Sequence, residues 1–158
     1  MIIANQNSTT QAVLAGSTQA IKTAEEELTQ AGFKVTPLPV SAAFHTPLVE
    51  HASKPFAKAV KKENFQKPHI PVFSNTTGTQ YPMDTDQIQE ILANHILNPV
   101  IFKTQIEEIY QNGGRVFVEV GPRQILGNLV KDILEDKPHE VVSVNPSRDK
   151  SSDRQFRE

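Results

Sequence analysis

The chain contains neither cysteine nor tryptophan among its 158 residues. Without cysteine it can form no disulfide, no thiolate metal site and no active site with a cysteine nucleophile. An excess of positive charge is missing too, because 16 basic and 18 acidic residues leave a formal net charge of -2. That balance argues against a protein that binds nucleic acid over a broad basic face. The basic residues form only one modest local patch, at Lys54, Lys58, Lys61 and Lys62.

Long apolar runs are also lacking, and none approaches the roughly 20 residues needed to cross a bilayer. The first residues, Met1 to Asn5, show no basic segment followed by a long apolar stretch, so they do not resemble a secretory signal. We therefore expect a cytoplasmic protein with no membrane contact. A hydrophobic content of 37% can support a packed core, in one domain or in one subdomain plus part of another.

Several motifs of catalytic chemistry are missing. No glycine-rich phosphate loop is present, since Gly113-Gly114 precede a predicted strand and so have the wrong polarity for one. No G-x-S-x-G sequence occurs, so there is no recognisable nucleophile elbow. Of the five histidines, His45 and His51 are six residues apart and would face different sides of a helix. We therefore expect no metal site.

The first forty residues predict a compact β-α-β unit. An apolar run at 11–16 indicates a buried strand, and the helix after it is capped by Ser17 and ends at Gly32. Residues 33–40 predict a second strand, which its two prolines confine to a sheet edge or an irregular path. We therefore expect a small subdomain over residues 2–40.

From Thr46 onward the predicted helices and strands alternate. Thr46 is a helix N-cap, and Pro47 occupies the first helical position. The later predicted elements are a strand at 70–75, a helix from Asp84 or Thr85 to about Leu97, a helix around Ile106 and Ile109, a strand at 116–120, a helix with an apolar stripe at 125–134 and a strand at 141–144. This alternation favours an α/β fold with parallel pairing in a core over 41–144, and a linker or tail over 145–158.

His45 has an unusual place in this pattern, directly after a predicted strand and before a capped helix. Catalytic groups concentrate at such junctions, because a rigid scaffold aims them into a crevice. The adjacent helix N-terminus disfavours the protonated imidazolium, and a neutral imidazole is what a general base needs. The alternative is a histidine that caps or packs locally and has no catalytic function.

Five segments in order along the chain carry a family resemblance. The segment from Val40 to Leu48, Val-Ser-Ala-Ala-Phe-His-Thr-Pro-Leu, closely resembles the active-site histidine motif of malonyl-CoA:acyl-carrier-protein acyltransferases. It is most similar to the acyltransferase domains of iterative polyketide and polyunsaturated fatty acid synthases. The other four segments are Asn5-Gln-Asn7-Ser8 with 12–16, Pro71 to Gly78, His95 to Phe102, and Phe117 to Pro122.

The resemblance implies a fold and a set of site residues. The fold is a ferredoxin-like small subdomain, here about residues 2–40, joined to the C-terminal part of an α/β-hydrolase-like core over 41–144. His45 is the expected general base and acid, oriented by the backbone carbonyl of His95. Phe44 matches the bulky residue that accompanies malonyl selection, although the first histidine of the family's H-A-F-H pattern is replaced here by alanine. Asn5 and Asn7 match positions that line the acyl or pantetheine cleft.

The family's serine elbow, its oxyanion-hole glutamine and its carboxylate-binding arginine all precede the Asn-x-Asn motif. None of them matches a segment here, because Arg115, Arg123 and Arg148 fall in other parts of the fold. We therefore expect a fragment that is inactive alone and that needs the missing N-terminal half. No bound cofactor is expected; malonyl-CoA is the substrate, and phosphopantetheine is carried by the partner, an acyl carrier protein, beside other synthase domains.

Two alternatives follow from the same residues. The chain could be a non-catalytic scaffold that docks a carrier protein on the lysine patch at 54–62, since carrier proteins are expected to be acidic. It could also be one half of a split enzyme, completed by a separate chain that bears the serine.

Overall fold

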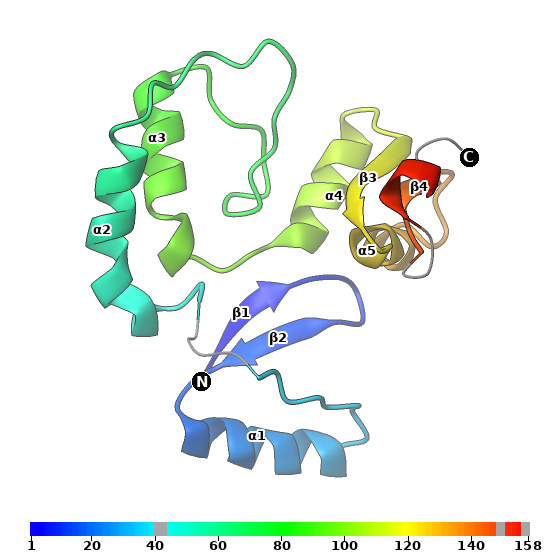
Figure 1. The fold of residues 1–158 in the computed structure, drawn as a ribbon. Helices are drawn as coiled ribbons and strands as arrows, with labels where there is room; N and C mark the ends of the chain where they lie inside the picture. Colours follow the sequence, from blue (N-terminus) through cyan, green and yellow to red (C-terminus); the bar gives the residue numbers. More distant parts are fainter. Residues whose placement is uncertain (40–43, 148–150, 156–158) are drawn as a thin grey trace.

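The computed structural model describes residues 1–39, 44–147 and 151–155. Figure 1 shows three groups of elements: a β-hairpin with one helix, a pair of helices with a long loop, and a cluster in which two strands pack with two helices. This mixed α/β arrangement agrees with the predicted class.

The first group holds strand β1 (Ile2–Gln6), strand β2 (Ala12–Ala15) and helix α1 (Thr18–Gln30). The two strands pair antiparallel. The Ser17 side chain caps α1 by accepting from the backbone N–H of Ala20 at 3.3 Å. Gly32 follows the helix with a φ of 88°, a left-handed conformation that glycine adopts without steric cost. The predicted helix is therefore confirmed at both ends.

The strand predicted at 33–40 is wrong where it can be examined. Residues 33–39 form no strand, and Val40 lies outside the described residues. Pro37 and Pro39 have no backbone N–H to give to a ladder, and almost every side chain of the segment is exposed. The observed order is therefore β-β-α in place of β-α-β.

The second group begins at Thr46, whose side chain accepts from the Leu48 N–H at 3.1 Å and caps the short 3-10 helix η1 (Pro47–Val49). Helix α2 (Glu50–Val60) continues from it and packs against α3 (Thr85–Ala93), as Figure 1 shows. Asp84 caps α3 by accepting from two backbone N–H groups, at 2.9 and 3.0 Å.

Helix α3 ends four residues before the predicted end at Leu97. The Asn94 side chain donates to the Glu90 carbonyl at 3.0 Å, and the Asn98 side chain donates to the Asn94 carbonyl at 2.7 Å. Asparagine side chains compete in this way with the helical backbone bonds. Residues His95–Leu97 form a separate 3-10 turn, η2.

The strand predicted at 70–75 is also wrong. Its segment forms a single antiparallel bridge, Phe73 to Gln80, around a tight turn in which Gly78 has a φ of 73°. Ile70 is 72% exposed, because no strand among the described residues covers it. An extended apolar segment without a partner strand forms a loop, whatever its β-propensity.

The third group contains α4 (Phe102–Gln111), β3 (Val116–Pro122), α5 (Ile125–Ile133) and β4 (Glu140–Asn145). Strands β3 and β4 pair in parallel, as predicted. The two helices contact each other, and between the helices and the sheet lies the hydrophobic core of Ile106, Val130, Ile133 and Leu134. Leu134 has no exposed surface, and burying such a side chain stabilises the fold by about 1.5–3 kcal/mol.

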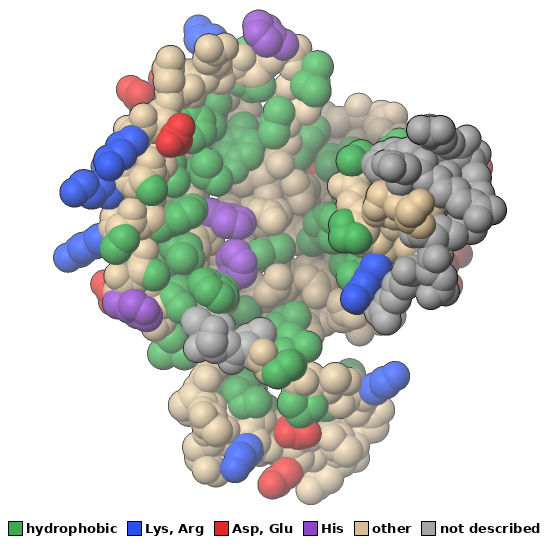
Figure 2. All heavy atoms as spheres, viewed as in Figure 1, with side chains coloured by type: hydrophobic (Ala, Val, Ile, Leu, Met, Phe, Trp, Pro, Cys, Tyr) green, Lys and Arg blue, Asp and Glu red, His purple; other side chains and the backbone are tan. Residues whose placement is uncertain are grey.

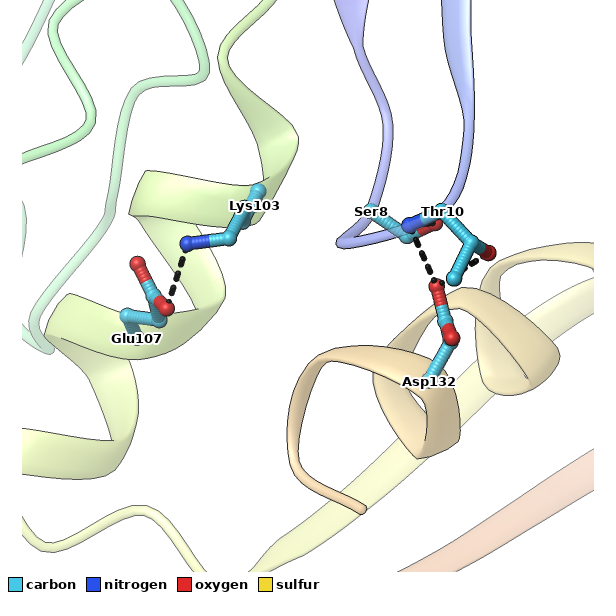
Figure 3. Close-up of polar contacts among 5 residues, drawn as sticks. All are labelled: Ser8, Thr10, Lys103, Glu107 and Asp132. Carbon is cyan, nitrogen blue, oxygen red and sulfur yellow. Dashed lines mark hydrogen bonds and ion pairs between the residues drawn. The ribbon is translucent and has the colours of Figure 1, made fainter.

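The groups are tied together by the segment after η2 and by one carboxylate. Val100 bridges β1, accepting from the Gln6 N–H at 2.8 Å and donating to the Ala4 carbonyl at 2.9 Å. Asp132 on α5 accepts from the N–H and hydroxyl of Thr10, at 3.2 and 2.9 Å, at the tip of the hairpin (Figure 3). Beyond β4, which ends at Asn145, the described residues of the predicted tail form one short helix, α6 (Ser152–Gln155).

No helix in the described part of the chain is long and apolar enough to cross a membrane.

Candidate active site

His45 lies at the start of the turn that leads into η1, in a strained backbone conformation. Its φ is 63°, in the left-handed region that costs a residue other than glycine about 1–2 kcal/mol. Its N–H donates to the carbonyl of Ile96 in η2 at 2.9 Å. Strained residues persist where the surrounding structure holds them, and they concentrate at functional sites.

The imidazole of His45 is oriented by the same turn. Its Nδ1 lies 3.2 Å from the carbonyl oxygen of His95, fifty residues along the chain. A carbonyl can only accept, so Nδ1 carries the hydrogen and donates. In the neutral ring Nε2 then keeps its lone pair, which is the arrangement a general base requires. The contact that the resemblance implied is present, and the catalytic role remains a prediction.

The imidazole of His95 also contacts His45. The two ring centroids are 4.9 Å apart and the ring planes meet at 73°, an edge-to-face arrangement. Figure 2 shows two neighbouring histidine side chains near the middle of the face in view. Burial, together with the charge that His45 carries when protonated, lowers the pKa of His95. A neutral ring is therefore favoured beside the candidate base.

Thr76 is a site residue that the sequence did not reveal. Its Oγ1 lies 2.6 Å from Nδ1 of His95. The threonine belongs to the loop predicted as a turn, and the loop is held by the buried hydroxyl of Ser74, which accepts from the Thr76 N–H at 3.1 Å. The turn-forming run at 76–78 was recognisable, but nothing in it indicated a partner nineteen residues away.

The predicted substrate-binding residues are only partly brought together. Phe44 adjoins His45 and is 50% exposed, while Ala42 and Ala43 lie outside the described residues. Asn5 is half-buried in β1 and forms a parallel bridge with Val100, on the segment that follows η2. Asn7 lies farther along, in the hairpin, where its side-chain amide donates to Gln11 at 2.9 Å.

The arginines that sequence analysis set aside have local roles where they are described. Arg115 stacks over the Tyr110 ring at 3.7 Å and donates to two backbone carbonyls. Arg123 has a φ of 73°, and its N–H donates to the Asn145 carbonyl at 2.7 Å. Arg148 lies outside the described residues.

The carboxylate of Glu119 lies at the start of α5. It accepts from the N–H groups of Leu126 and Gly127, at 3.1 and 2.9 Å, and from the Ser143 hydroxyl at 3.3 Å. A carboxylate that satisfies the first N–H groups of a helix is a structural cap. The described residues contain no cluster of three or more side chains that could hold a metal ion.

The family model of the acyl transferase domain matches residues 1–157. The chain belongs to the acyl transferase domain family.

Relatives of this acyl transferase domain include a synthase subunit and malonyl CoA-acyl carrier protein transacylases. A polyunsaturated fatty acid synthase protein of Thraustochytrium sp. (strain ATCC 26185 / S-3) is 40% identical over 99% of the chain, which spans 6% of that protein. The malonyl CoA-acyl carrier protein transacylase of Bacillus subtilis (strain 168) is 30% identical over 83% of the chain, which spans 41% of that protein. The crystal structure of the acyltransferase domain from the second module of the salinomycin polyketide synthase superimposes with a TM-score of 0.87 at 29% identity, covering 98% of this chain and 36% of that one.

Proposed function

We propose that this chain supplies the acid–base part of an active site that transfers malonyl from CoA to the phosphopantetheine thiol of an acyl carrier protein. The observation that carries the proposal is the donation from His45 Nδ1 to the His95 carbonyl, in a member of the acyl transferase family. The nucleophile is a serine borne by an N-terminal half with the G-x-S-x-G motif. That half is joined to this chain or supplied separately, as in a split enzyme.

In the first half-reaction the serine Oγ bonds to the malonyl thioester carbon while its proton passes to His45 Nε2. The tetrahedral intermediate then collapses, the C–S bond breaks, and the leaving CoA sulfur takes the proton from His45. In the second half-reaction His45 accepts the proton of the phosphopantetheine thiol as the thiol sulfur bonds to the carbonyl carbon of the seryl ester. The ester C–O bond then breaks, and the leaving serine oxygen takes that proton from His45. Within this scheme Phe44 favours malonyl, Asn5 and Asn7 line the cleft, and no resident cofactor takes part.

The uncovered face of the β3–β4 sheet supports the need for a second half. Helices α4 and α5 cover one face of the sheet, whereas Val118 and Val120 on the other face are 55% and 78% exposed. Parallel sheets are normally covered on both faces. Among the described residues β3 also has no partner on its second edge. Both features fit a sheet that continues into the remaining half of the domain. Within this proposal the chain contributes the small subdomain at 2–40 and the part of the core at 41–144.

A reconstitution experiment tests the proposal. The chain is mixed with an N-terminal acyltransferase half that carries the serine, and transfer of radiolabelled malonyl from CoA to an acyl carrier protein is measured. We expect no covalent adduct on this chain alone, transfer by the mixture, and a loss of roughly 10²–10⁴-fold in His45→Gln. A stable malonyl adduct on the isolated chain would overturn the proposal.

A substitution on the uncovered face tests the role of the second half. Val120→Lys should abolish reconstitution but leave the unfolding of the isolated chain unchanged, because Val120 is 78% exposed. Gln30→Lys, on the exposed end of α1, is the matched control. Equal reconstitution by the two variants would show that the β3–β4 face does not bind the other half.

Carrier-protein docking is a second candidate function, favoured by the exposed lysines of α2 and its C-terminal end. The described residues form no ion pair with them. Figure 2 shows basic side chains along the outer side of the group that contains α2. The patch consists of Lys54, Lys58, Lys61 and Lys62.

Titration with an acidic carrier protein distinguishes docking from catalysis. We expect salt-sensitive binding by the chain alone and loss of binding when the four lysines become glutamine. Lys22→Gln with Lys34→Gln, both exposed near α1, is the control. Absence of binding at low salt would exclude the docking function.

A further inference from the structure

We infer that Thr76 is a positioning residue for the acid–base histidine: its hydroxyl holds the His95 imidazole, and with it the η2 turn, against His45. The inference rests on the proposed function for its catalytic consequence, but its structural part is testable in the chain alone.

The loop that presents Thr76 is held rigid by hydrogen bonds. The buried hydroxyl of Ser74 accepts from the N–H groups of Thr76 and Thr77, at 3.1 and 3.4 Å. The Gly78 N–H donates to the Ser74 carbonyl at 2.8 Å. The Asn75 carbonyl accepts from the Ile101 N–H at 2.7 Å, which joins the loop to the segment after η2. Thr76 is therefore held from both sides and can act as a fixed point.

Thr76 holds the imidazole of His95. The 2.6 Å contact between Thr76 Oγ1 and His95 Nδ1 selects one of the two orientations of the ring, because a flipped ring would present a carbon to the hydroxyl. In that orientation the His95 ring meets the His45 ring at 73°. A hydroxyl both donates and accepts, so Thr76 can hold Nδ1 in either tautomer of the neutral ring that partial burial favours.

Among the described residues, only η2 forms hydrogen bonds with His45. The His95 carbonyl accepts from His45 Nδ1 at 3.2 Å, and the Ile96 carbonyl accepts from the His45 N–H at 2.9 Å. A three-residue 3-10 turn is a weak element by itself. The bond from Thr76 ties this turn to a rigid loop, so its loss should loosen both bonds to His45.

The test compares Thr76→Val, which has nearly the same shape but no hydroxyl, with Thr76→Ser. Thr79→Val is the matched control, because the exposed Thr79 hydroxyl donates to Thr77 in the same loop, at 3.1 Å, and does not contact His95. Nitrogen-15 NMR of the histidine rings reports the tautomer of His45 in the isolated chain. We expect a single tautomer with the hydrogen on Nδ1 in the wild type, Thr76→Ser and Thr79→Val, and a mixture of tautomers in Thr76→Val.

In the reconstituted transferase, Thr76→Val should lower kcat by roughly 2- to 12-fold with KM unchanged, the size of one neutral hydrogen bond. Thr76→Ser should restore the rate. If the wild-type chain mixed with the N-terminal half shows no malonyl transfer, the proposed function fails. The NMR comparison in the isolated chain still decides the inference in that case. A His45 tautomer in Thr76→Val equal to that in Thr79→Val would overturn the inference.

His95→Phe gives an independent check in case Thr76→Val does not fold. This variant removes the ring nitrogen but keeps the backbone carbonyl, so it should give the same mixture of His45 tautomers. The double variant Thr76→Val with His95→Phe should show the same mixture of His45 tautomers as either single variant, because both substitutions remove the same bond. A wild-type tautomer in His95→Phe would contradict the inference.

Discussion

Replacing Asp132 with asparagine should loosen the tip of the β1–β2 hairpin without unfolding the domain. Asp132 accepts two hydrogen bonds from Thr10, and the three side chains at this contact are shown in Figure 3. Bonds to a charged acceptor contribute about 1.5–3 kcal/mol and neutral ones about 0.5–1.5. Solvent screening reduces the difference at this exposed site to about 0.5–1 kcal/mol. Asparagine and aspartate have similar helix propensities, so α5 itself should be little affected.

The stability lost in Asp132→Asn should depend on pH. The Ser8 hydroxyl, together with bonds from Thr10, outweighs the opposing effect of burial and holds the pKa of the Asp132 carboxyl below its usual range. A depressed pKa contributes stability above the unfolded value of about 3.9, and this contribution disappears as pH falls through the folded pKa. The difference between wild type and Asp132→Asn should therefore be complete near neutral pH, begin to fall near the unfolded pKa of about 3.9, and vanish only below the lowered pKa of the folded state.

Hydrogen exchange of the Thr10 amide measures this directly, because that N–H donates to Asp132. We expect exchange roughly 2- to 5-fold faster in Asp132→Asn at neutral pH, which corresponds to the free-energy difference above. Asp136→Asn, at an exposed position beyond α5, is the control. Equal Thr10 exchange in the two variants at neutral pH, or a difference that persists in strong acid, would refute the reasoning.

Three further predictions concern packing and capping. Leu134→Ala should lower the free energy of unfolding by about 2–5 kcal/mol in urea denaturation, because Leu134 is fully buried; a loss below about 1 kcal/mol would show that the site collapses around the cavity. Gly127→Ala should destabilise the protein by about 1–3 kcal/mol, since the new Cβ would lie 2.9 Å from a Val141 methyl. Gly121→Ala is the control and should be close to neutral, because its new Cβ meets no atom within 4 Å. Equal urea midpoints for the two variants would contradict this prediction. Glu119→Ala should lower stability by about 1–3 kcal/mol by leaving helix N–H groups of α5 without a partner, and unchanged denaturation would show that water replaces the carboxylate.

The elements that sequence analysis placed well are those whose ends are specified by nearby residues. Ser17 and Gly32 bracket α1, and Asp84 caps α3, because caps act over two or three residues. The parallel pair β3–β4 was predicted from the alternation of helices and strands. The strands at 33–40 and 70–75 were wrong because a strand needs a partner, and local sequence carries no information about whether one is available.

The candidate site divides in the same way. Sequence alone determined which residue is the candidate for acid–base chemistry, because His45 stands in a motif whose neighbours and order along the chain are specific. Sequence also determined membership of the acyl transferase family, which the match over residues 1–157 confirms. The resemblance also implied the bond from His45 to the His95 carbonyl. Only the tertiary structure decided the rest: the left-handed backbone of His45, its bond to the Ile96 carbonyl, and the contact of the Thr76 hydroxyl with the His95 ring. These contacts depend on how α3, η2 and the loop at 74–78 pack together, and no spacing along the sequence encodes that packing.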